Sequence, residues 1–266
     1  MKIVIPSHNR SNNVLPLDFI PESYYDKTYI VTRKGEQEEL YSSYKEKVNV
    51  LSFNCDGISS KRDQICRHFH NELIWMLDDD CLLYNAVVHQ VDETRTRIKI
   101  TEQVSEESFY EFIEYCTDML KTYPHGIVRP ALFARPKTYM PYRLNMWAFT
   151  NAMLNLKTLS ADDLEYSYSS HSEDVVAFLN TIEKGYQSFC LSKWMIKSER
   201  PGKPGGMTEI RTANMITEAT QKIHSKFPDH TKIKSGYPLK DGTIPQTLVI
   251  RPKKKPSSPL ENFMEL

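Results

Sequence analysis

The stretch ELIWMLDDDCLLY (residues 72–84) decides the fold class. Its apolar run over residues 73–77 is typical of a buried strand, and it ends at three consecutive carboxylates, Asp78, Asp79 and Asp80. Two ionised carboxylates about 4 Å apart repel by roughly 4 kcal/mol at an effective dielectric near 20. Such a cluster therefore indicates either a cation with strong hydrogen-bond donors, or a solvated turn or helix cap.

Three more apolar runs precede this strand at regular spacing. They cover residues 2–6, 28–33 and 48–53. Residues 35–47 and 59–71 between the runs have helix composition, and this alternation indicates right-handed crossovers. We therefore predict an α/β fold with a mainly parallel central sheet flanked by helices. Such sheets bind ligands at the carboxyl ends of their strands, where both SHNR (7–10) and the acidic cluster fall.

The second half of the chain is less regular. Apolar spacing predicts a helix over 105–121 and another over 172–185, with Ser172 as its N-cap and Gly185 just past its end. Strands are expected over 126–129, 146–156, 187–191 and 247–250, and a further helix ends near Phe227. We predict a catalytic domain over 1–228 and a C-terminal extension, 229–266, with a basic, proline-rich tail.

Composition narrows the class of protein. The 34 basic and 34 acidic residues give no overall signal for binding polyanions, so any nucleic-acid contact must come from local patches. Five cysteines without a CxxC pair favour reduced thiols over a zinc cluster. MKIVIPSHNR turns polar too early for a signal peptide, and no apolar run is long enough for a membrane span. We expect a cytoplasmic protein and leave its oligomeric state open.

The acidic residues fit metal and general-base chemistry. Asp78 and Asp80 are two positions apart, so both can reach one ion in a turn, and oxygen ligands beside a phosphate favour Mg²⁺ or Mn²⁺ over zinc. Glu173 and Asp174 open a predicted helix, where the helix dipole favours negative charge. A carboxylate at that position can equally act as a general base, and spacing alone leaves both explanations open.

Basic residues near the carboxyl ends of the predicted strands are consistent with an anion-binding site. Lys61 and Arg62 lie in the first part of a helix whose N-terminus attracts anions, and Arg10 follows the first strand. Basic residues on a solvated helix face explain the same pattern.

Four motifs, in this order, resemble the GT-A glycosyltransferases, specifically the large inverting class with a single nucleotide-sugar-binding domain. The motifs are IVIPSHNR (3–10), GISSKRDQI (57–65), WMLDDDC (75–81) and HSEDVVAFLNTIEKGY (171–186). The resemblance covers residues 1–195. It implies a GT-A-like fold and a metal-dependent, inverting transfer of a sugar from a UDP-linked donor to an acceptor hydroxyl.

The resemblance also implies a role for each motif. Residues expected to bind the donor nucleotide are Pro6, Ser7, His8, Arg10, Thr32, Arg33, Asp56, Arg62, Asp78 and Asp79. Asp78 and Asp80 are expected to bind Mn²⁺ or Mg²⁺. Asp174 is expected to be the general base, with Glu173 its neighbour or a ligand of the acceptor. A further metal ligand is expected from His171, His224 or His230.

A narrower resemblance is to phage-encoded DNA-base glycosyltransferases, including the TET-associated group and the arabinosyl transferases of hydroxymethylcytosine. It rests on the compact length, the absence of membrane or secretion signals and the Gly-Gly-Met loop after the catalytic helix. It implies that the acceptor is the hydroxymethyl group of a modified pyrimidine in duplex DNA. Gly205 and Gly206 are expected in a lid, and Trp147 on the acceptor side. Lys253–Lys255 with Arg251 are expected either to contact phosphates or to form a solvated tail.

Three other functions remain open at this point. One is a glycosyltransferase that acts on a glycan or a protein. Another is a sugar nucleotidyltransferase, which needs a glycine-rich loop after its first strand, whereas SHNRSNN contains no glycine. The third is a non-catalytic module that binds cations or nucleic acid. Binding of UDP only in the presence of Mn²⁺ or Mg²⁺ would separate the enzymes from the module.

Overall fold

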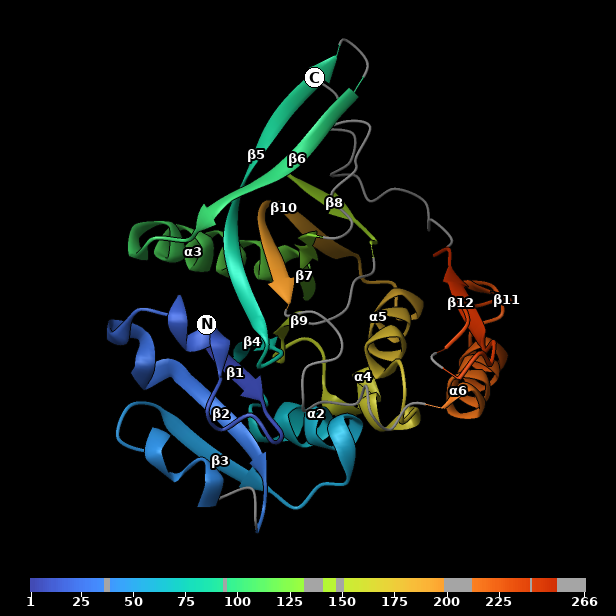
Figure 1. The fold of residues 1–266 in the computed structure, drawn as a ribbon, viewed down its shortest axis with the longest axis horizontal. Helices are drawn as coiled ribbons and strands as arrows, with labels where there is room; N and C mark the ends of the chain where they lie inside the picture. Colours follow the sequence, from blue (N-terminus) through green and yellow to red (C-terminus); the bar gives the residue numbers. More distant parts are fainter. Residues whose placement is uncertain are drawn as a thin grey trace.

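One large sheet organises the computed structural model, which describes residues 1–35, 39–92, 95–131, 141–146, 151–198, 212–239 and 241–252 (Figure 1). Its strand order is β3-β2-β1-β4-β9-β7-β10-β5-β6, and β8 pairs with β10. The strands are β1 (Lys2–Pro6), β2 (Thr28–Arg33), β3 (Asn49–Phe53), β4 (Leu73–Leu77), β5 (Cys81–Asp92), β6 (Arg95–Gln103), β7 (His125–Pro130), β8 (Tyr142–Leu144), β9 (Asn151–Asn155) and β10 (Ser188–Ser198). The predicted α/β class is confirmed.

The first four strands form the parallel part of the sheet. β1 pairs in parallel with both β2 and β4, and β2 pairs in parallel with β3. Beyond β4 the sheet becomes mixed, because β9 runs antiparallel to β4 and β7, while β7 and β10 are parallel. The parallel part brings the carboxyl ends of β1 and β4 to one edge, as the sequence predicts.

A long antiparallel ribbon, β5 and β6, occupies residues 81–103, to which the sequence analysis assigns no strand. Figure 1 shows this ribbon extending beyond the rest of the sheet. β5 begins directly after the acidic cluster, so Asp78–Asp80 form the connection between two strands. The cluster is therefore held at both ends by the sheet.

Helices cover both faces of the sheet. They are α2 (Gly57–His68), α3 (Glu106–Thr122), α4 (Ala161–Leu164), α5 (Glu173–Glu183) and α6 (Ala213–Lys226), with 3₁₀ turns η1 (Leu15–Asp18), η2 (Glu22–Lys27), η3 (Ser42–Tyr44) and η5 (Tyr166–Tyr168). The alternation of β1 divides the core, because Ile3 and Ile5 pack with Phe109 of α3, whereas Val4 packs with Ile65 of α2. Gly126 lies so close to the Phe189 ring that an added Cβ would come within 2.1 Å of it.

Two local expectations are corrected. The helix expected over 35–47 is broken: residues 39 and 40 are helical, but Tyr41 turns inward and a 3₁₀ turn follows at Ser42–Tyr44. Ser172 does occupy the N-cap position of α5, yet its φ is +58° and its side chain makes no capping hydrogen bond. Gly185 follows α5 with a φ of +88°, as expected of a C′ glycine.

The last described elements form a small unit beside α5. β11 (Thr231–Ser235) and β12 (Gln246–Ile250) make an antiparallel hairpin, and Leu248 and Ile250 pack with Ile223 of α6 and with apolar residues of α5. The boundary at residue 228 stays a prediction. Within the described ranges, no helix is both long and apolar enough to span a membrane.

Candidate active site

A cavity of about 400 Å³ lies at the carboxyl ends of β1 and β4, a size typical of small-molecule sites. Eleven of the predicted site residues line it: Pro6, Ser7, His8, Arg10, Arg33, Arg62, Asp78, Asp79, Asp80, His171 and Glu173. Gly57 adopts a φ of +82° at the start of α2 and also lines the cavity. Two loops and two helix starts therefore meet at one site.

Asp79 ties the loop after β1 to the end of β4. Ser7 Oγ donates to Asp79 Oδ2 at 2.5 Å, and Arg10 Nη1 donates to Asp79 Oδ1 at 2.8 Å. Arg10 Nη1 also lies 2.9 Å from Asp80 Oδ2. Burial raises the pKa of Asp79, while the Ser7 hydroxyl and Arg10 oppose that rise. The acidic cluster is thus partly neutralised by the loop that it anchors.

Arg62 joins the acidic cluster to the start of α5. Its guanidinium is buried, with Nη2 at 2.7 Å from Asp78 Oδ1 and Nη1 at 2.9 Å from Glu173 Oε1. Burial raises the pKa of Asp78 to about 6, which shows that desolvation and the neighbouring carboxylates outweigh the attraction of Arg62. Arg62 is therefore not one of the basic residues of a solvated helix face, the alternative explanation given for this motif.

Two further residues hold this site together. Lys61 is buried, lines the cavity and donates from Nζ to the Ser7 carbonyl at 2.6 Å, and burial lowers its pKa. The hydroxyl of Tyr41, a fully buried residue, lies 2.6 Å from Ser7 Oγ and accepts from the Arg10 backbone N–H at 2.9 Å. The GISSKRDQI motif signals Lys61, but no local pattern signals Tyr41, because 34 positions separate it from Ser7.

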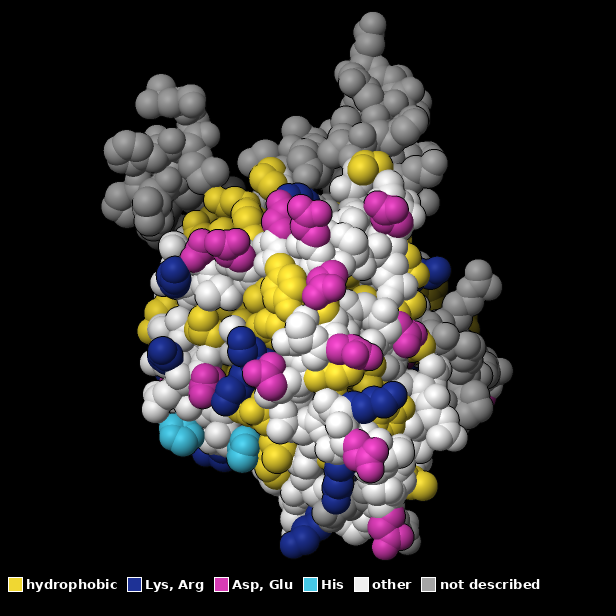
Figure 2. All heavy atoms as spheres, turned by 90° about the vertical axis from the view of Figure 1, so that its left-hand side faces the viewer, with side chains coloured by type: hydrophobic (Ala, Val, Ile, Leu, Met, Phe, Trp, Pro, Cys, Tyr) yellow, Lys and Arg dark blue, Asp and Glu magenta, His cyan; other side chains and the backbone are white. Residues whose placement is uncertain are grey.

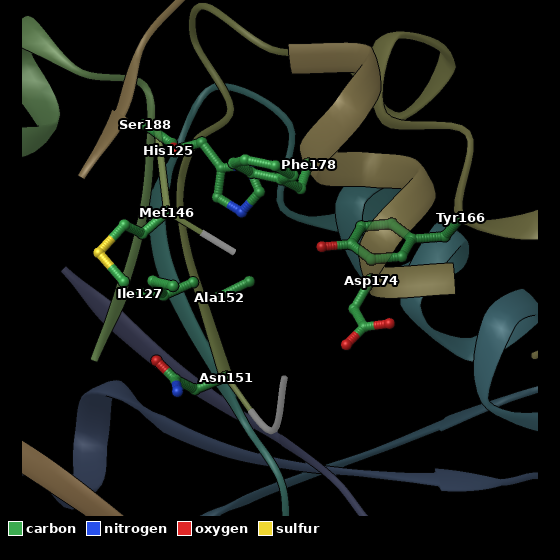
Figure 3. Close-up of a pocket in the computed structure, with 9 residues that line it drawn as sticks. All are labelled: His125, Ile127, Met146, Asn151, Ala152, Tyr166, Asp174, Phe178 and Ser188. Atoms are coloured by element: carbon green, nitrogen blue, oxygen red, sulfur yellow. The ribbon is translucent and has the colours of Figure 1, made fainter. Parts of the chain in front are cut away.

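Asp174 faces a different cavity from Glu173. It lines a second space of about 10 Å³, enough for one water molecule, together with His125, Tyr166 and Phe178 (Figure 3). In Figure 3, Tyr166 lies beside Asp174 and directs its hydroxyl toward this space. Burial and the adjacent Glu173 carboxylate raise the pKa of Asp174 to about 7, against the attraction of Arg62. Consecutive helix residues point about 100° apart, so the two carboxylates face different sides of the α5 N-terminus.

Some predicted residues lie apart from the larger cavity. Thr32 is buried and bonds to Ser52 Oγ at 3.1 Å, so it does not line the cavity. Asp56 is exposed and forms an ion pair with Arg33 at 3.0 Å. Trp147, Gly205 and Gly206 lie outside the described residues.

Of the three candidate histidines, only His171 lines the larger cavity. His224 bonds to Thr231 at 2.8 Å, and His230 forms an ion pair with Glu183 at 2.8 Å. These contacts tie both side chains to the C-terminal unit and to the far end of α5.

The residues around Asp78 and Asp80 fit a divalent ion that takes most of its ligands from phosphate and water and few from the protein. The described residues contain no group of three or more His, Cys, Asp or Glu arranged to hold a metal. Mg²⁺ commonly takes one or two protein carboxylates and completes its shell with phosphates and water. Asp78 and Asp80 supply two such carboxylates on one cavity, so the donor set suits an ion bound together with a diphosphate.

The family model for TET-associated glycosyltransferases matches residues 1–206. The chain belongs to this family. Two relatives, each named beta-glucosyl-HMC-alpha-glucosyl-transferase, come from Enterobacteria phages T2 and T6 and are 31% and 30% identical over 238 residues. The alignment covers 88% of this chain and 84% of each relative. Among solved structures, glucosyl-3-phosphoglycerate synthase from Mycobacterium tuberculosis, determined with Mn²⁺ and UDP, is 8% identical, with a TM-score of 0.49 over 94% of this chain and 86% of that chain.

This TET-associated glycosyltransferase is therefore an enzyme of sugar transfer, as the four motifs predict. The family match contains every residue of the larger cavity and Asp174. It ends before α6 and the β11–β12 hairpin. The C-terminal unit thus lies outside the family match.

Proposed function

We propose that this glycosyltransferase moves a sugar from a UDP-linked donor to hydroxymethylcytosine in phage DNA, with inversion at the anomeric carbon. The observation that carries the proposal is the 400 Å³ cavity at the ends of β1 and β4, where cationic side chains and the acidic cluster meet. The two phage relatives, named for glucosyl transfer on glucosyl-HMC, support the acceptor. A phage DNA acceptor would place the enzyme in the host cytoplasm.

The charge balance of the cavity argues for a donor that binds together with a cation. Four basic side chains, Arg10, Arg33, Lys61 and Arg62, face four acidic ones, Asp78, Asp79, Asp80 and Glu173. Near-zero net charge gives weak attraction for a diphosphate alone. A divalent ion held by Asp78 and Asp80 supplies, when bound, positive charge beside the leaving nucleoside diphosphate. Lys61 and Arg10 fix the loop after β1, which keeps the nucleotide end of the cavity in shape.

Asp174 is proposed to take the proton of the acceptor hydroxyl. The acceptor oxygen attacks the anomeric carbon, the bond from that carbon to the diphosphate oxygen breaks, and the hydroxyl proton moves to Asp174. A base with a pKa of about 7 is ionised in a useful fraction near neutral pH and still accepts a proton readily. The one-water space beside Asp174 is distinct from the cavity of Glu173 and Arg62, so the acceptor hydroxyl oxygen, which is the size of that water, would occupy it from a different side of the α5 N-terminus. Attack from that side inverts the anomeric centre.

The acceptor hydroxyl belongs to one of two groups. It is either the hydroxymethyl group itself or a hydroxyl of a sugar already attached to it, as the relatives' names indicate for those proteins. Both choices place the reacting oxygen outside the base ring, where it reaches Asp174 more easily than a ring atom in a stacked duplex does.

A transfer assay tests the proposal. The protein is incubated with labelled UDP-sugars and Mn²⁺ on three duplexes of one sequence, which contain cytosine, hydroxymethylcytosine or glucosylated hydroxymethylcytosine. Label is expected in one of the two modified duplexes and not in the cytosine duplex. If neither modified duplex gains label while a glycan or protein acceptor does, the DNA acceptor is wrong.

A further inference from the structure

Positive charge is concentrated near the end of a chain that is neutral overall. Residues 229–255 contain seven Lys and Arg against two Asp, so the rest of the chain carries a net charge of −5. The strand sequences TKIKS and QTLVI of β11 and β12 contain no acidic residue. This segregation gives the C-terminal unit a charge that the sheet domain lacks.

The hairpin places its lysines away from the core. Lys232 pairs with Val249 and Lys234 with Thr247, whereas Ile233 pairs with Leu248. Leu248 packs toward α6 and α5, so alternation puts Lys232 and Lys234 on the opposite face of the hairpin. Both lysines are exposed. We call this face, with Lys232, Lys234 and Arg251, the basic hairpin face.

Arg251 extends the same face beyond β12. Its backbone N–H donates to the His230 carbonyl at 2.7 Å, which continues the ladder by one step. Arg251 is two positions from Val249, so the two side chains point to the same face of the hairpin. Val249 pairs with Lys232, so this is the face that carries the lysines. Tyr237, directly after β11, is 85% exposed and adds an aromatic side chain to the unit.

The hairpin is also well placed relative to Asp174. His230 contacts Glu183 in the last turn of α5, and Asp174 lies in the first turn of that helix. Nine residues of helix rise by about 14 Å, close to the ~12 Å width of the DNA major groove. The His230–Glu183 contact therefore fixes the C-terminal unit about 14 Å along α5 from Asp174, a distance that the backbone of a duplex bound at Asp174 can span.

The other extended surface is a weaker candidate. The β5–β6 ribbon has a shape that fits a groove, but residues 81–103 contain three basic and three acidic residues. On the molecular face that Figure 2 presents, Lys and Arg side chains are interspersed with Asp and Glu. Neither region offers the excess positive charge that phosphate binding requires.

We propose that the basic hairpin face binds the phosphate backbone of the duplex DNA acceptor. The inference rests on the proposed function for the identity of the acceptor. Each Lys or Arg contact with a phosphate adds about 0.9 to the slope of log affinity against log salt. Binding through this face is sequence-independent and positions the duplex, while selection of the modified base is left to the transfer site at the α5 N-terminus.

The test compares two variants that remove equal charge from exposed sites. Lys232→Gln/Lys234→Gln alters the basic hairpin face, and Lys45→Gln/Lys47→Gln alters exposed lysines before β3, an edge strand of the large sheet. Affinity for an unmodified duplex is measured by fluorescence anisotropy over a range of salt concentrations. The hairpin variant is expected to lower the salt slope by about 2 and the control variant to leave it unchanged. UDP binding should be the same in all three proteins, which shows that each is folded.

The outcomes separate this inference from the proposed function. An unchanged salt slope in the hairpin variant overturns the inference, and so does an equal loss in the control variant. A loss that appears instead in Arg95→Gln/Arg97→Gln assigns DNA binding to the ribbon and also overturns it. Failure of the proposed function shows differently, as an absence of wild-type transfer to the modified duplexes. A hairpin-specific loss of duplex binding supports the basic hairpin face even in that case.

Discussion

Arg62 donates to Glu173 across 2.9 Å, although 111 positions separate the two residues. The same guanidinium holds Asp78 at 2.7 Å. One buried side chain of α2 therefore fixes the end of β4 and the start of α5 relative to each other. Because Glu173 precedes Asp174, this ion pair also sets where Asp174 points.

Replacing Arg62 should strongly destabilise the fold. Arg62→Met leaves the Asp78 and Glu173 carboxylates buried without their cation, and breaking such a pair costs about 3–5 kcal/mol. The free energy of unfolding from urea denaturation measures the loss. Arg67→Met is the matched control, since Arg67 is about half exposed and its ion pairs with Asp63 and Asp162 lie at the surface. Equal stability of the two variants would contradict the role given to Arg62.

The pH dependence of stability should follow the raised pKa of Asp174. Its folded-state pKa is about 7 against an ordinary 3.8, so the folded protein binds the extra proton between these values. The contribution of Asp174 to the free energy of unfolding is therefore fully present below about pH 4 and is lost as pH rises through about 7. Asp174→Asn should flatten this fall, although Asp78, with a pKa of about 6, keeps part of it. Denaturation midpoints from pH 4 to 8 measure the difference, and an identical pH profile in the variant would count against the raised pKa.

Transfer should have the opposite pH dependence, because the ionised form of Asp174 is the base. The value of kcat/KM for the acceptor is expected to rise through about pH 7. Asp174→Asn should keep UDP binding and lose transfer. Normal transfer by this variant would mean that another group is the base.

The first half of the fold and the composition of the cavity follow from the sequence by simple rules. Parallel strands end at one edge, which is why Ser7 and Asp79 meet at 2.5 Å despite a separation of 72 positions. The pattern RTRIKI in β6 has the alternating period of a half-exposed strand. This strand of the ribbon could therefore have been predicted from the sequence.

Side-chain partners across distant elements could not be predicted in this way. No local pattern brings Tyr41 to Ser7, because that contact depends on how η3 packs under the loop after β1. Sequence spacing also does not show that Glu173 and Asp174 face different cavities, since that depends on how Arg62 orients the first turn of α5.

Removing the Tyr41 hydroxyl should weaken donor binding. Tyr41→Phe removes the part-buried hydrogen bond that the Arg10 N–H donates to the Tyr41 hydroxyl, at a cost of about 1 kcal/mol. The loop that carries Ser7 and Arg10 should then lose its fixed shape, which raises the Kd for UDP. Tyr237→Phe is the control, because Tyr237 is 85% exposed. Unchanged UDP affinity and stability in Tyr41→Phe would show that the hydroxyl does not organise the site.

The central claim is that the cavity at the ends of β1 and β4 binds a nucleoside diphosphate together with a divalent ion. Calorimetric titration of UDP, with Mn²⁺ and then with a chelator, tests it most directly. The predicted result is a Kd that rises at least about tenfold (1.4 kcal/mol) with chelator and equally in Asp80→Asn, which leaves Arg10 bonded to Asp79. UDP affinity that is unchanged by both treatments, or no UDP binding by the folded protein under any of these conditions, would contradict the claim.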